Sequence, residues 1–264
     1  MTAWSCAQTE KHKTIAFVPT MGYLHEGHLS LVERAQKEAS LTVVSIYVNP
    51  TQFGPKEDFS RYPRNSKRDF NLLRKAGVDV VFAPRNLYEK NARISVNPGP
   101  MAEVLCGAFR PGHFSGVATV VLKLFNIVCP DVAVFGQKDA QQYAILQRMV
   151  KELDLPVRMV AAPTLREKDG LAMSSRNTFL SEKERAFAPT LYQALRFVKS
   201  TFVKGEKNPA RALKAASKIP QGRLQYLSAV HPNTLMPVQR LCKGTLVASA
   251  MFAGKTRLID NIIL

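Results

Sequence analysis

Short apolar runs alternate with amphipathic stretches over the first two thirds of the chain. The runs are rich in valine, isoleucine and alanine, which is typical of strands buried on both faces of a sheet. We expect strands at 14–18, 41–48, 78–83, 132–135 and 157–161, and helices between them at 28–39, 66–76, 114–128 and 140–153. Because parallel strands are joined by crossover connections, this order predicts an α/β fold, with a Rossmann-like parallel sheet and helices on both of its faces.

The last third of the chain lacks this alternation. A polar stretch without a period comes first, and Ser181 and Glu184 then have the spacing of a capping box at a helix start. The expected elements are helices at 181–204 and from Pro209 onward, and strands at 224–230, 246–252 and 257–262. The sequence therefore predicts a Rossmann-like domain over 1–164 and a smaller α+β domain over 165–264.

The composition is that of a globular protein. The chain has 264 residues, of which 46% are hydrophobic and 22% charged, and this balance excludes a disordered chain. No apolar run approaches the roughly 20 residues that a membrane helix needs, and residues 1–13 lack the apolar core of a secretory signal. The four cysteines have no metal-binding spacing; they are Cys6, Cys106, Cys129 and Cys242. We expect a cytoplasmic protein without a membrane partner.

The excess of positive charge is the unusual feature of the composition. The chain has 37 Lys and Arg against 20 Asp and Glu, for a formal net charge of +17, and residues 166–264 contribute 17 of the cations and 6 of the acids. Such an excess fits a nucleic-acid partner, an anionic substrate or a basic surface, and charge alone does not choose between them. Because no basic run is interleaved with aromatic residues, we expect no nucleic-acid partner.

Two histidines stand between the first expected strand and the first expected helix. His25 and His28 occur there together with Gly22 and Gly27, at the carboxyl edge of the expected sheet, where ligands of open α/β sheets bind. Backbone amides at a helix start favour phosphate, and imidazoles can donate hydrogen bonds to phosphoryl oxygens. The alternative is a turn with two incidental histidines. The sequence favours a phosphate-binding site at this position.

Other polar segments follow strands or begin helices. Lys138 is placed to meet phosphate, and Gln142 lies one helical turn further on. Ser174, Ser175 and Arg176 can clamp a triphosphate, although the segment taken alone is more typical of a Ser-rich linker. The remaining candidates are Asn49 and Gln52 after the second strand, and Arg110 and His113 before a helix. No nucleophile elbow, dinucleotide fingerprint or P-loop competes, so the chemistry implied is phosphate positioning and charge stabilisation.

In several segments the chain resembles the pantoate–β-alanine ligase (pantothenate synthetase) family. The matching segments are 17–32, 44–53, 110–114, 135–139, 169–177 and 257–261, in the family's order. The His-x-Gly-His core is also similar to that of class I aminoacyl-tRNA synthetases and other members of the nucleotidyltransferase superfamily. The resemblance implies a ligase of pantothenate and coenzyme A biosynthesis. It would condense pantoate with β-alanine at the expense of ATP, through a pantoyl adenylate, and give pantothenate, AMP and pyrophosphate.

The resemblance also implies which residues bind ATP and act in catalysis. His28, His25 and Lys138 are the expected catalytic residues, with His28 as the acid. Residues of the second domain are expected to close over the nucleotide. The expected ATP-binding residues are Met21, Gly22, Tyr23, Leu24, His25, Glu26, Gly27, His28, Gly136, Gln137, Lys138, Asp139, Leu165, Met173, Ser174, Ser175 and Arg176.

For the other substrates, the resemblance implies that Gln52 and Gln142 grip pantoate, with Gln52 also near β-alanine. Further substrate-binding candidates are Asn49, Arg110 and His113. Mg²⁺ is the expected cofactor of ATP, and Asp69 is the expected metal ligand. Cys106 stands where many family members have Glu, and we expect it only to be packed. The family also implies a homodimer. Two alternatives stay open: a different nucleotidyltransferase on the same fold, and a nucleic-acid-binding module.

Overall fold

The computed structural model describes residues 1–55 and 57–264, which divide into two compact units. The first unit comprises Met1–Glu103, Gly107–Gly136 and Ile145–Pro163, and the second comprises Val104–Cys106, Gln137–Ala144 and Thr164–Leu264. The second unit therefore takes in two early segments that the sequence assigns to the domain over 1–164. Among the described residues, no helix has the length and apolar character needed to cross a membrane.

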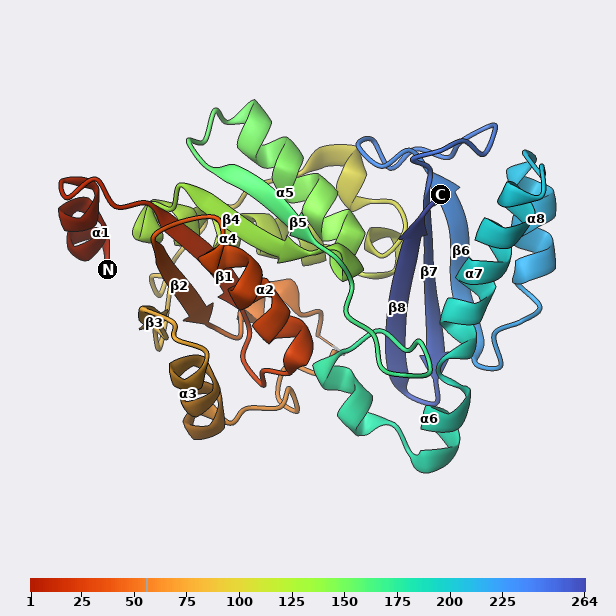
Figure 1. Cartoon of the computed structure of the whole chain (residues 1–264), viewed down its shortest axis with the longest axis horizontal. Coiled ribbons are helices and arrows are strands. Elements are labelled where there is room, and N and C mark those ends of the chain that lie inside the picture. The colour runs from red at the N-terminus through yellow and green to blue at the C-terminus, as the bar shows by residue number, and fades with distance from the viewer. Residues whose placement is uncertain (56) are drawn as a thin grey trace. The chain divides into compact units, whose positions relative to one another are not determined.

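The first unit is built on a five-stranded sheet in the order β3-β2-β1-β4-β5, with every neighbouring pair parallel (Figure 1). Its strands are β1 (Ile15–Thr20), β2 (Leu41–Ile46), β3 (Val80–Phe82), β4 (Val132–Gly136) and β5 (Arg158–Ala162). The predicted Rossmann-like parallel sheet is confirmed. Strands β2 and β3 lie on one side of β1, and β4 and β5 lie on the other, so the strand order reverses between β1 and β4. Ligands of such sheets bind beyond the carboxyl ends of the strands at the point of reversal.

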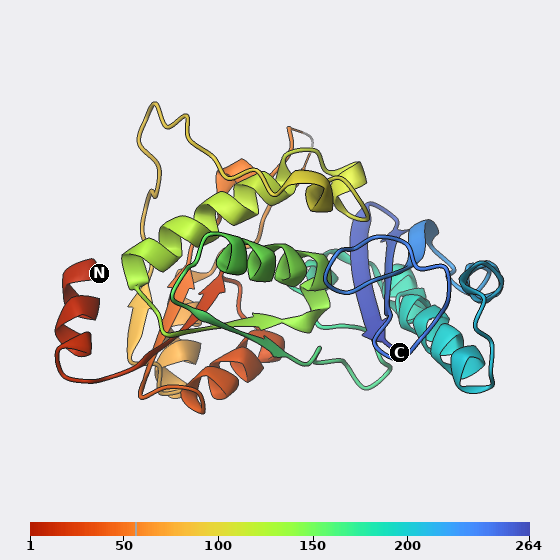
Figure 2. The same cartoon turned by 90° about the horizontal axis from the view of Figure 1, so that it is seen from above.

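Helices cover both faces of this sheet. They are α2 (Glu26–Gln36), α3 (Ser66–Lys75), α4 (His113–Val128) and α5 (Ala140–Glu152), whereas α1 (Thr2–Thr9) contacts α4. Val32 of α2 and Leu73 of α3 pack on one face of the sheet, and Phe125 of α4 meets Phe17 edge-to-face on the other, with ring centroids 6.4 Å apart. Figure 2 shows α2 and α4 on opposite sides of the strands. The 3₁₀ helices are η1 (Pro50–Gln52), η2 (Gly99–Ala102), η3 (Gly107–Phe109), η4 (Gln137–Asp139) and η5 (Ser175–Phe179).

The second unit is an antiparallel sheet covered by helices. Its strands β6 (Arg223–Val230), β7 (Leu246–Ala253) and β8 (Thr256–Ile263) pair in that order. Its helices are α6 (Glu182–Phe187), α7 (Thr190–Val203) and α8 (Pro209–Ala216). Leu195 of α7 and Ala212 of α8 pack against Val247 of β7. The predicted α+β character of this part of the chain is confirmed.

The helix expected over 181–204 is wrong in one respect, because it is two helices. Proline has no amide hydrogen and clashes with the preceding helical turn, so Pro189 separates α6 from α7. The capping box at its start is confirmed. Ser181 Oγ accepts the amide of Glu184 at 3.4 Å, and the Ser181 amide donates to Glu184 Oε2 at 2.9 Å.

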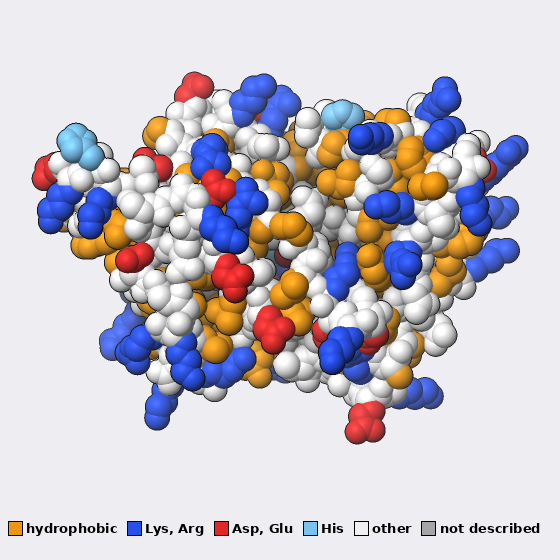
Figure 3. All heavy atoms as spheres, in the orientation of Figure 1, with side chains coloured by type: hydrophobic (Ala, Val, Ile, Leu, Met, Phe, Trp, Pro, Cys, Tyr) orange, Lys and Arg blue, Asp and Glu red, His pale blue; other side chains and the backbone are white. Residues whose placement is uncertain are grey.

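The positive charge of the second unit is dispersed over its surface. Lys204, Arg211 and Lys214 all lie at exposed positions in or beside α7 and α8. On the face shown in Figure 3, the Lys and Arg side chains of this region are separated by hydrophobic and uncharged ones. This spacing is typical of a solvated surface rather than of a basic stripe that follows a nucleic-acid backbone.

Candidate active site

The segment after β1 is a tight turn that depends on Gly22. Gly22 and Tyr23 both have left-handed backbone angles, with φ of 80° and 51°. A Cβ atom on Gly22 would lie 3.0 Å from Oδ2 of Asp69, so a larger residue would strain both the backbone and this contact. The turn leads from the end of β1 to His25, the residue that caps α2.

His25 and His28 build the start of α2 through their ring nitrogens. Nδ1 of His25 accepts the amide of Gly27 at 3.1 Å, and Nδ1 of His28 accepts the amide of His25 at 3.3 Å. A nitrogen that accepts a hydrogen bond carries no proton, so the proton of each neutral imidazole lies on Nε2. The ring centroids are 4.0 Å apart. The pair therefore provides two Nε2–H donors beside the N-terminal amides of a helix, a combination suited to phosphate.

Asp69 anchors the same turn from α3. This residue is 1% exposed, and its Oδ2 accepts the amide of Tyr23 at 2.7 Å while its Oδ1 accepts the amide of Leu24 at 2.9 Å. The guanidinium of Arg68 lies over the Tyr23 ring, with Cζ 5.4 Å from the centroid. Both carboxylate oxygens are thus engaged by backbone amides, which is the arrangement of an anchor and not of an open metal ligand.

The chemistry of the surrounding side chains does not fit a metal site held by the protein. Across residues 1–55 and 57–264, no group of three or more His, Cys, Asp or Glu side chains could hold a metal ion. Mg²⁺ needs several oxygen ligands in octahedral geometry, and it is commonly held by substrate phosphates together with one or two carboxylates. The expectation that Asp69 is a metal ligand therefore finds no support in its contacts.

The side-chain amide of Gln52 is held in one orientation. Asn49, which is 1% exposed, donates from Nδ2 to Gln52 Oε1 at 3.0 Å and to a carbonyl of α4 at 3.1 Å. Oδ1 of Asn49 accepts hydrogen bonds from the hydroxyls of Thr51 and Tyr88, each at 3.0 Å. Gln52 Nε2 lies 3.3 Å from the sulfur of Met21. Because Asn49 uses its donors and acceptors inside the protein, it acts by orienting Gln52.

Helix α4 approaches the backbone of Thr51 and Gln52 closely at Gly116. A Cβ atom at this position would lie 2.7 Å from the backbone nitrogen of Gln52 and 2.6 Å from the carbonyl carbon of Thr51. Separations under 3.0 Å are essentially never seen for real Cβ atoms. Glycine at position 116 therefore sets the distance between α4 and the backbone of Gln52.

Arg110 and His113 connect to Gln52 through its backbone. Arg110 donates from Nε and Nη2 to the two carboxylate oxygens of Glu57, at 2.6 Å each, and its Nη1 lies 2.9 Å from His113 Nε2. Because a guanidinium only donates, His113 accepts at Nε2 and donates from Nδ1 to the carbonyl of Gln52 at 2.7 Å. Burial opposes ionisation of Glu57, but the hydrogen bonds and charge of Arg110 outweigh it and lower the pKa of Glu57. Both residues thus support Gln52.

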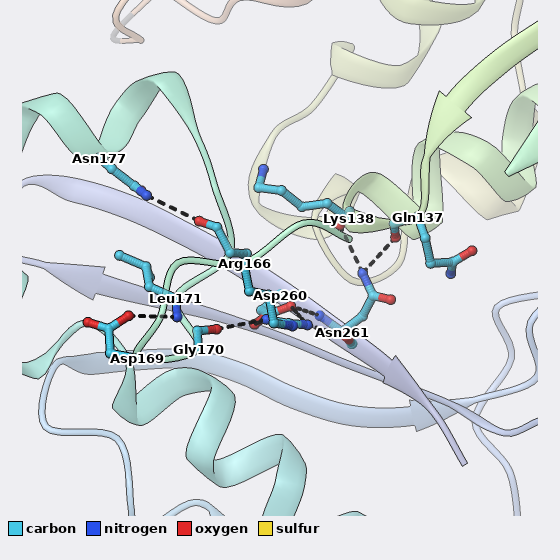
Figure 4. Close-up of polar contacts among 10 residues, drawn as sticks. Gln137, Lys138, Arg166, Asp169, Gly170, Leu171, Asn177, Asp260 and Asn261 are labelled. Carbon is cyan, nitrogen blue, oxygen red and sulfur yellow. Dashed lines mark hydrogen bonds and ion pairs between the residues drawn. The ribbon is translucent and has the colours of Figure 1, made fainter. Parts of the chain in front are cut away.

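The second unit holds the turn that carries Lys138. Gly136 ends β4, and Gln137–Asp139 form η4. Asn261 donates from Nδ2 to the carbonyl oxygens of Gln137 and Lys138, each at 2.9 Å (Figure 4). The ammonium nitrogen of Lys138 lies 3.7 Å from Asp139 Oδ2. Gln142 is half-buried in the first turn of α5.

The remaining candidates of the second unit share one loop. Arg166 and Ala172 form an antiparallel bridge, and the amide of Met173 donates to the carbonyl of Leu165 at 3.0 Å. Oγ of Ser174 accepts the amide of Arg176 at 3.3 Å and so caps η5. The structure thus brings together Leu165, Met173, Ser174, Ser175 and Arg176.

Three residues that contact the candidates are not found from the sequence pattern. Glu57 and Tyr88 lie in irregular segments, where no period marks an inward-facing position. Asn261 carries a signal that could have been used, because it is a polar residue within an apolar strand and within one of the segments that resemble the family. A buried polar residue of this kind needs a hydrogen-bond partner.

Comparison with known proteins gives the same family over almost the whole chain. The family model described as pantoate-beta-alanine ligase matches residues 1–263. The pantothenate synthetase of Thermoanaerobacter sp. (strain X514) is 51% identical over 257 residues, which cover 95% of this chain and 91% of that protein.

Solved structures are similar as well. The crystal structure of pantothenate synthetase from Thermus thermophilus has a TM-score of 0.91 at 47% identity, and the match covers 95% of this chain and 93% of that one. Pantoate-beta-alanine ligase from Francisella tularensis, complexed with beta-gamma ATP and beta-alanine, has a TM-score of 0.80 at 34% identity, over 98% and 94% of the two chains. On the strength of this agreement in sequence and structure, the chain belongs to the pantoate–β-alanine ligase family.

Proposed function

We propose that the candidate residues carry out the reaction of this family in two steps. The carboxylate of pantoate attacks the α-phosphorus of ATP, which forms pantoyl adenylate and releases pyrophosphate. The amine of β-alanine then attacks the acyl carbon, which forms the amide of pantothenate and releases AMP. Neither step needs a nucleophile from the protein, so positioning and charge stabilisation supply the catalysis.

The observation that carries this proposal is the pair of histidines at the start of α2. Their Nδ1 atoms accept backbone amides, so each ring donates from Nε2 while it remains neutral. Such donors, together with the positive end of the helix dipole, stabilise the negative charge that develops on phosphoryl oxygens. We assign His28 as the acid of the reaction and His25 as a second donor to the phosphates.

The other substrates are assigned to the amide side chains. Gln52 binds pantoate and lies near β-alanine, and Gln142 also binds pantoate. Asn49 and His113 take part indirectly, since the first orients the side chain of Gln52 and the second holds its carbonyl. Arg110 supports His113 and is itself fixed by Glu57.

The nucleotide is assigned to the segments that the family resemblance names. The turn Met21–His28 of the first unit binds the phosphates, together with Lys138 in the turn Gly136–Asp139. Lys138 acts as a point charge on the triphosphate. Leu165 and the loop Met173–Arg176 bind the rest of ATP, where the hydroxyls of two serines and the guanidinium of Arg176 supply donors.

Mg²⁺ belongs to this proposal as a partner of ATP and not as a resident metal. Because the contacts of Asp69 are those of an anchor, we propose that the ion arrives on the triphosphate. We also propose a homodimer, on the family resemblance, and a cytoplasmic location, on the sequence features described above. Light scattering of the purified protein tests the first, and cell fractionation tests the second.

Isotope exchange between pyrophosphate and ATP tests the proposed reaction. We expect label to enter ATP only when pantoate is present, and AMP and pantothenate to form in equal amounts after β-alanine is added. Exchange that proceeds equally well without pantoate would favour a different nucleotidyltransferase activity. ADP as the nucleotide product would exclude a pantoyl adenylate intermediate.

Replacing His28 by alanine tests its assigned role in the exchange. The loss of one transition-state donor should slow the exchange by about 10²–10³-fold. A rate close to that of the unaltered enzyme would overturn the assignment.

A further inference from the structure

Asn261 reaches two consecutive carbonyl groups of the turn that carries Lys138. The residue is 4% exposed and lies on β8, and its Nδ2 donates to the oxygens of Gln137 and Lys138 at 2.9 Å each (Figure 4). These two hydrogen bonds fix the orientation of both peptide groups. They therefore also fix the backbone position from which the Lys138 side chain extends. The proposed function places the ammonium group of that side chain on the phosphates.

The carbonyl oxygen of the Asn261 side chain indicates that this residue adds little to the stability of the fold. Its Oδ1 atom is buried and has no hydrogen-bond partner among the described residues. A buried acceptor left unpaired costs about as much free energy as two neutral hydrogen bonds return. The net contribution of the amide to folding is therefore close to zero, and its effect lies in the geometry of the turn.

The preceding residue, Asp260, holds the other nucleotide segment of the same unit. Its two carboxylate oxygens accept from Nη1 and Nη2 of Arg166, at 2.6 and 2.9 Å. Arg166 also donates to the carbonyl of Gly170 at 3.1 Å, and its Cζ lies 3.6 Å from the centroid of the Tyr192 ring. Burial raises the pKa of Asp260, and the hydrogen bonds and charge of Arg166 oppose that shift.

Adjacent residues of one strand thus fix two separate loops. The backbone amide of Asn261 donates to Oδ1 of Asp260 at 2.7 Å, which ties the Asp260 side chain to the backbone of its neighbour. Asn261 holds the turn Gln137–Lys138, whereas Asp260 holds Arg166 at the start of the loop that leads to Met173–Arg176. Strand β8 is hydrogen-bonded along its length to β7, so it is a rigid support for both.

We propose that Asn261 is a positioning residue that sets the place of Lys138 for ATP, with Asp260 setting the neighbouring nucleotide loop through Arg166. This proposal rests on the assignment of Lys138 to ATP in the proposed function. Lysine has a long, flexible side chain, so a fixed backbone origin limits the positions that its ammonium group can take. A displacement of about 1 Å in a reacting group can cost up to about 10²-fold in rate.

A double-mutant cycle on ATP affinity tests this role. The affinity of Asn261→Ala, Lys138→Ala and the double variant for a non-hydrolysable ATP analogue is measured by calorimetry. We expect each single substitution to weaken binding by about 10-fold, which corresponds to about 1.4 kcal/mol. Because Asn261 acts through Lys138, the double variant should bind no more weakly than Lys138→Ala alone. The KM for ATP should rise in Asn261→Ala, while the KM for pantoate stays unchanged.

Two further variants control for folding. Asn261→Asp keeps the volume but replaces the donating group by an oxygen that repels both carbonyls, and it should weaken analogue binding at least as much as the alanine variant. Thr245→Ala removes a buried acceptor of the Cys242 amide, at 3.1 Å, in the turn before β7 and outside the residues that pair with Asp260 and Asn261, and it should leave analogue affinity unchanged.

The outcomes separate this proposal from the proposed function. If the loss of affinity in the double variant equals the product of the losses in the two single variants, Asn261 acts independently of Lys138. This result would overturn the positioning role. Unchanged affinity in Asn261→Ala, with weakened affinity in Lys138→Ala, would also overturn it while the proposed function stands. Unchanged affinity in Lys138→Ala would remove Lys138 from the ATP site, and the positioning role would fall with it.

Discussion

Replacing Gly116 by alanine tests how closely α4 must approach Gln52, to which we assign pantoate binding. The added methyl group would lie 2.4 Å from the carbonyl oxygen of Thr51 and 2.7 Å from the backbone nitrogen of Gln52, whereas ordinary van der Waals contact begins at 3.4 Å. The segment Thr51–Gln52 must therefore retreat by about 1.0 Å, the difference between the first and the last of these distances. The neighbouring carbonyl of Gly116 also accepts the Asn49 amide at 3.1 Å, so the orientation of Gln52 would be disturbed as well.

The expected magnitude follows from this geometry. Inserting one methyl group into a packed interior typically costs about 1–3 kcal/mol of stability. A displacement approaching 1 Å at a substrate-binding group can lower activity by up to about 10²-fold. We therefore expect Gly116→Ala to raise the KM for pantoate and to lower kcat/KM by one to two orders of magnitude (roughly 10–10²-fold). The KM for ATP should change much less.

Gly54 provides a matched control two positions beyond Gln52. Among the residues that the structure describes, a Cβ atom there meets only Glu57, with Cγ at 3.7 Å, which is ordinary contact, and the φ of Gly54 lies outside the left-handed range. Gly54→Ala should therefore leave both kinetics and thermal unfolding nearly unchanged. Initial-rate kinetics with each substrate varied in turn, together with unfolding midpoints, compare the two variants. If Gly116→Ala leaves the KM for pantoate unchanged, the close approach of α4 does not determine the position of Gln52, and the reasoning is refuted.

Three further predictions address other parts of the molecule. Asp69→Asn leaves one backbone amide of the turn without an acceptor, so it should cost about 1–3 kcal/mol in denaturant unfolding and should lower kcat, whereas unaltered kcat would contradict the anchoring role. The Arg110–Glu57 pair contributes stability above the ordinary Glu pKa of 4.5 and loses it as pH falls through the lowered pKa of Glu57. The difference in unfolding midpoint between the enzyme and Glu57→Gln should therefore shrink below pH 4.5, and a constant difference would contradict this account. Ser181→Ala removes the cap of α6 and should cost about 0.5–2 kcal/mol with unchanged kinetics; reduced activity would show that the cap has a wider role.

The parallel sheet could be predicted because strands that are buried on both faces have a recognisable composition within a short stretch of sequence. Strand β2, for example, lies between two helical layers, so 41–48 is a continuous β-branched and mainly apolar segment without an alternation of polar and apolar positions. The helix over 181–204 shows the limit of this signal. Its apolar period continues through Pro189 because α6 and α7 both face the core of the second unit, while the break itself depends on one missing amide.

The place of the candidate residues could also be predicted, but not the atoms that they use. Asn49 and Gln52 both follow β2 and both have an amide side chain. The amide of Asn49, however, is hydrogen-bonded to the hydroxyl groups of two neighbouring residues and to Gln52 itself. The family resemblance implies that Asp69 is a metal ligand, and the sequence does not show that its carboxylate accepts the amides of Tyr23 and Leu24, which are 46 and 45 positions away. Contacts between backbone groups and a distant side chain leave no pattern in the sequence.

The bonds from Asn261 to the turn that carries Lys138 bear on how the enzyme forms in the cell. They join residues 124 and 123 positions apart, so strands β1 to β5 have all left the ribosome before Asn261 is made. Contacts between residues so far apart form late, because a long loop must first be closed. A nascent chain that has already paired its parallel sheet therefore still lacks a fixed Lys138. Under the proposed assignment of Lys138 to the phosphates, the ATP site is among the last parts of this enzyme to be completed.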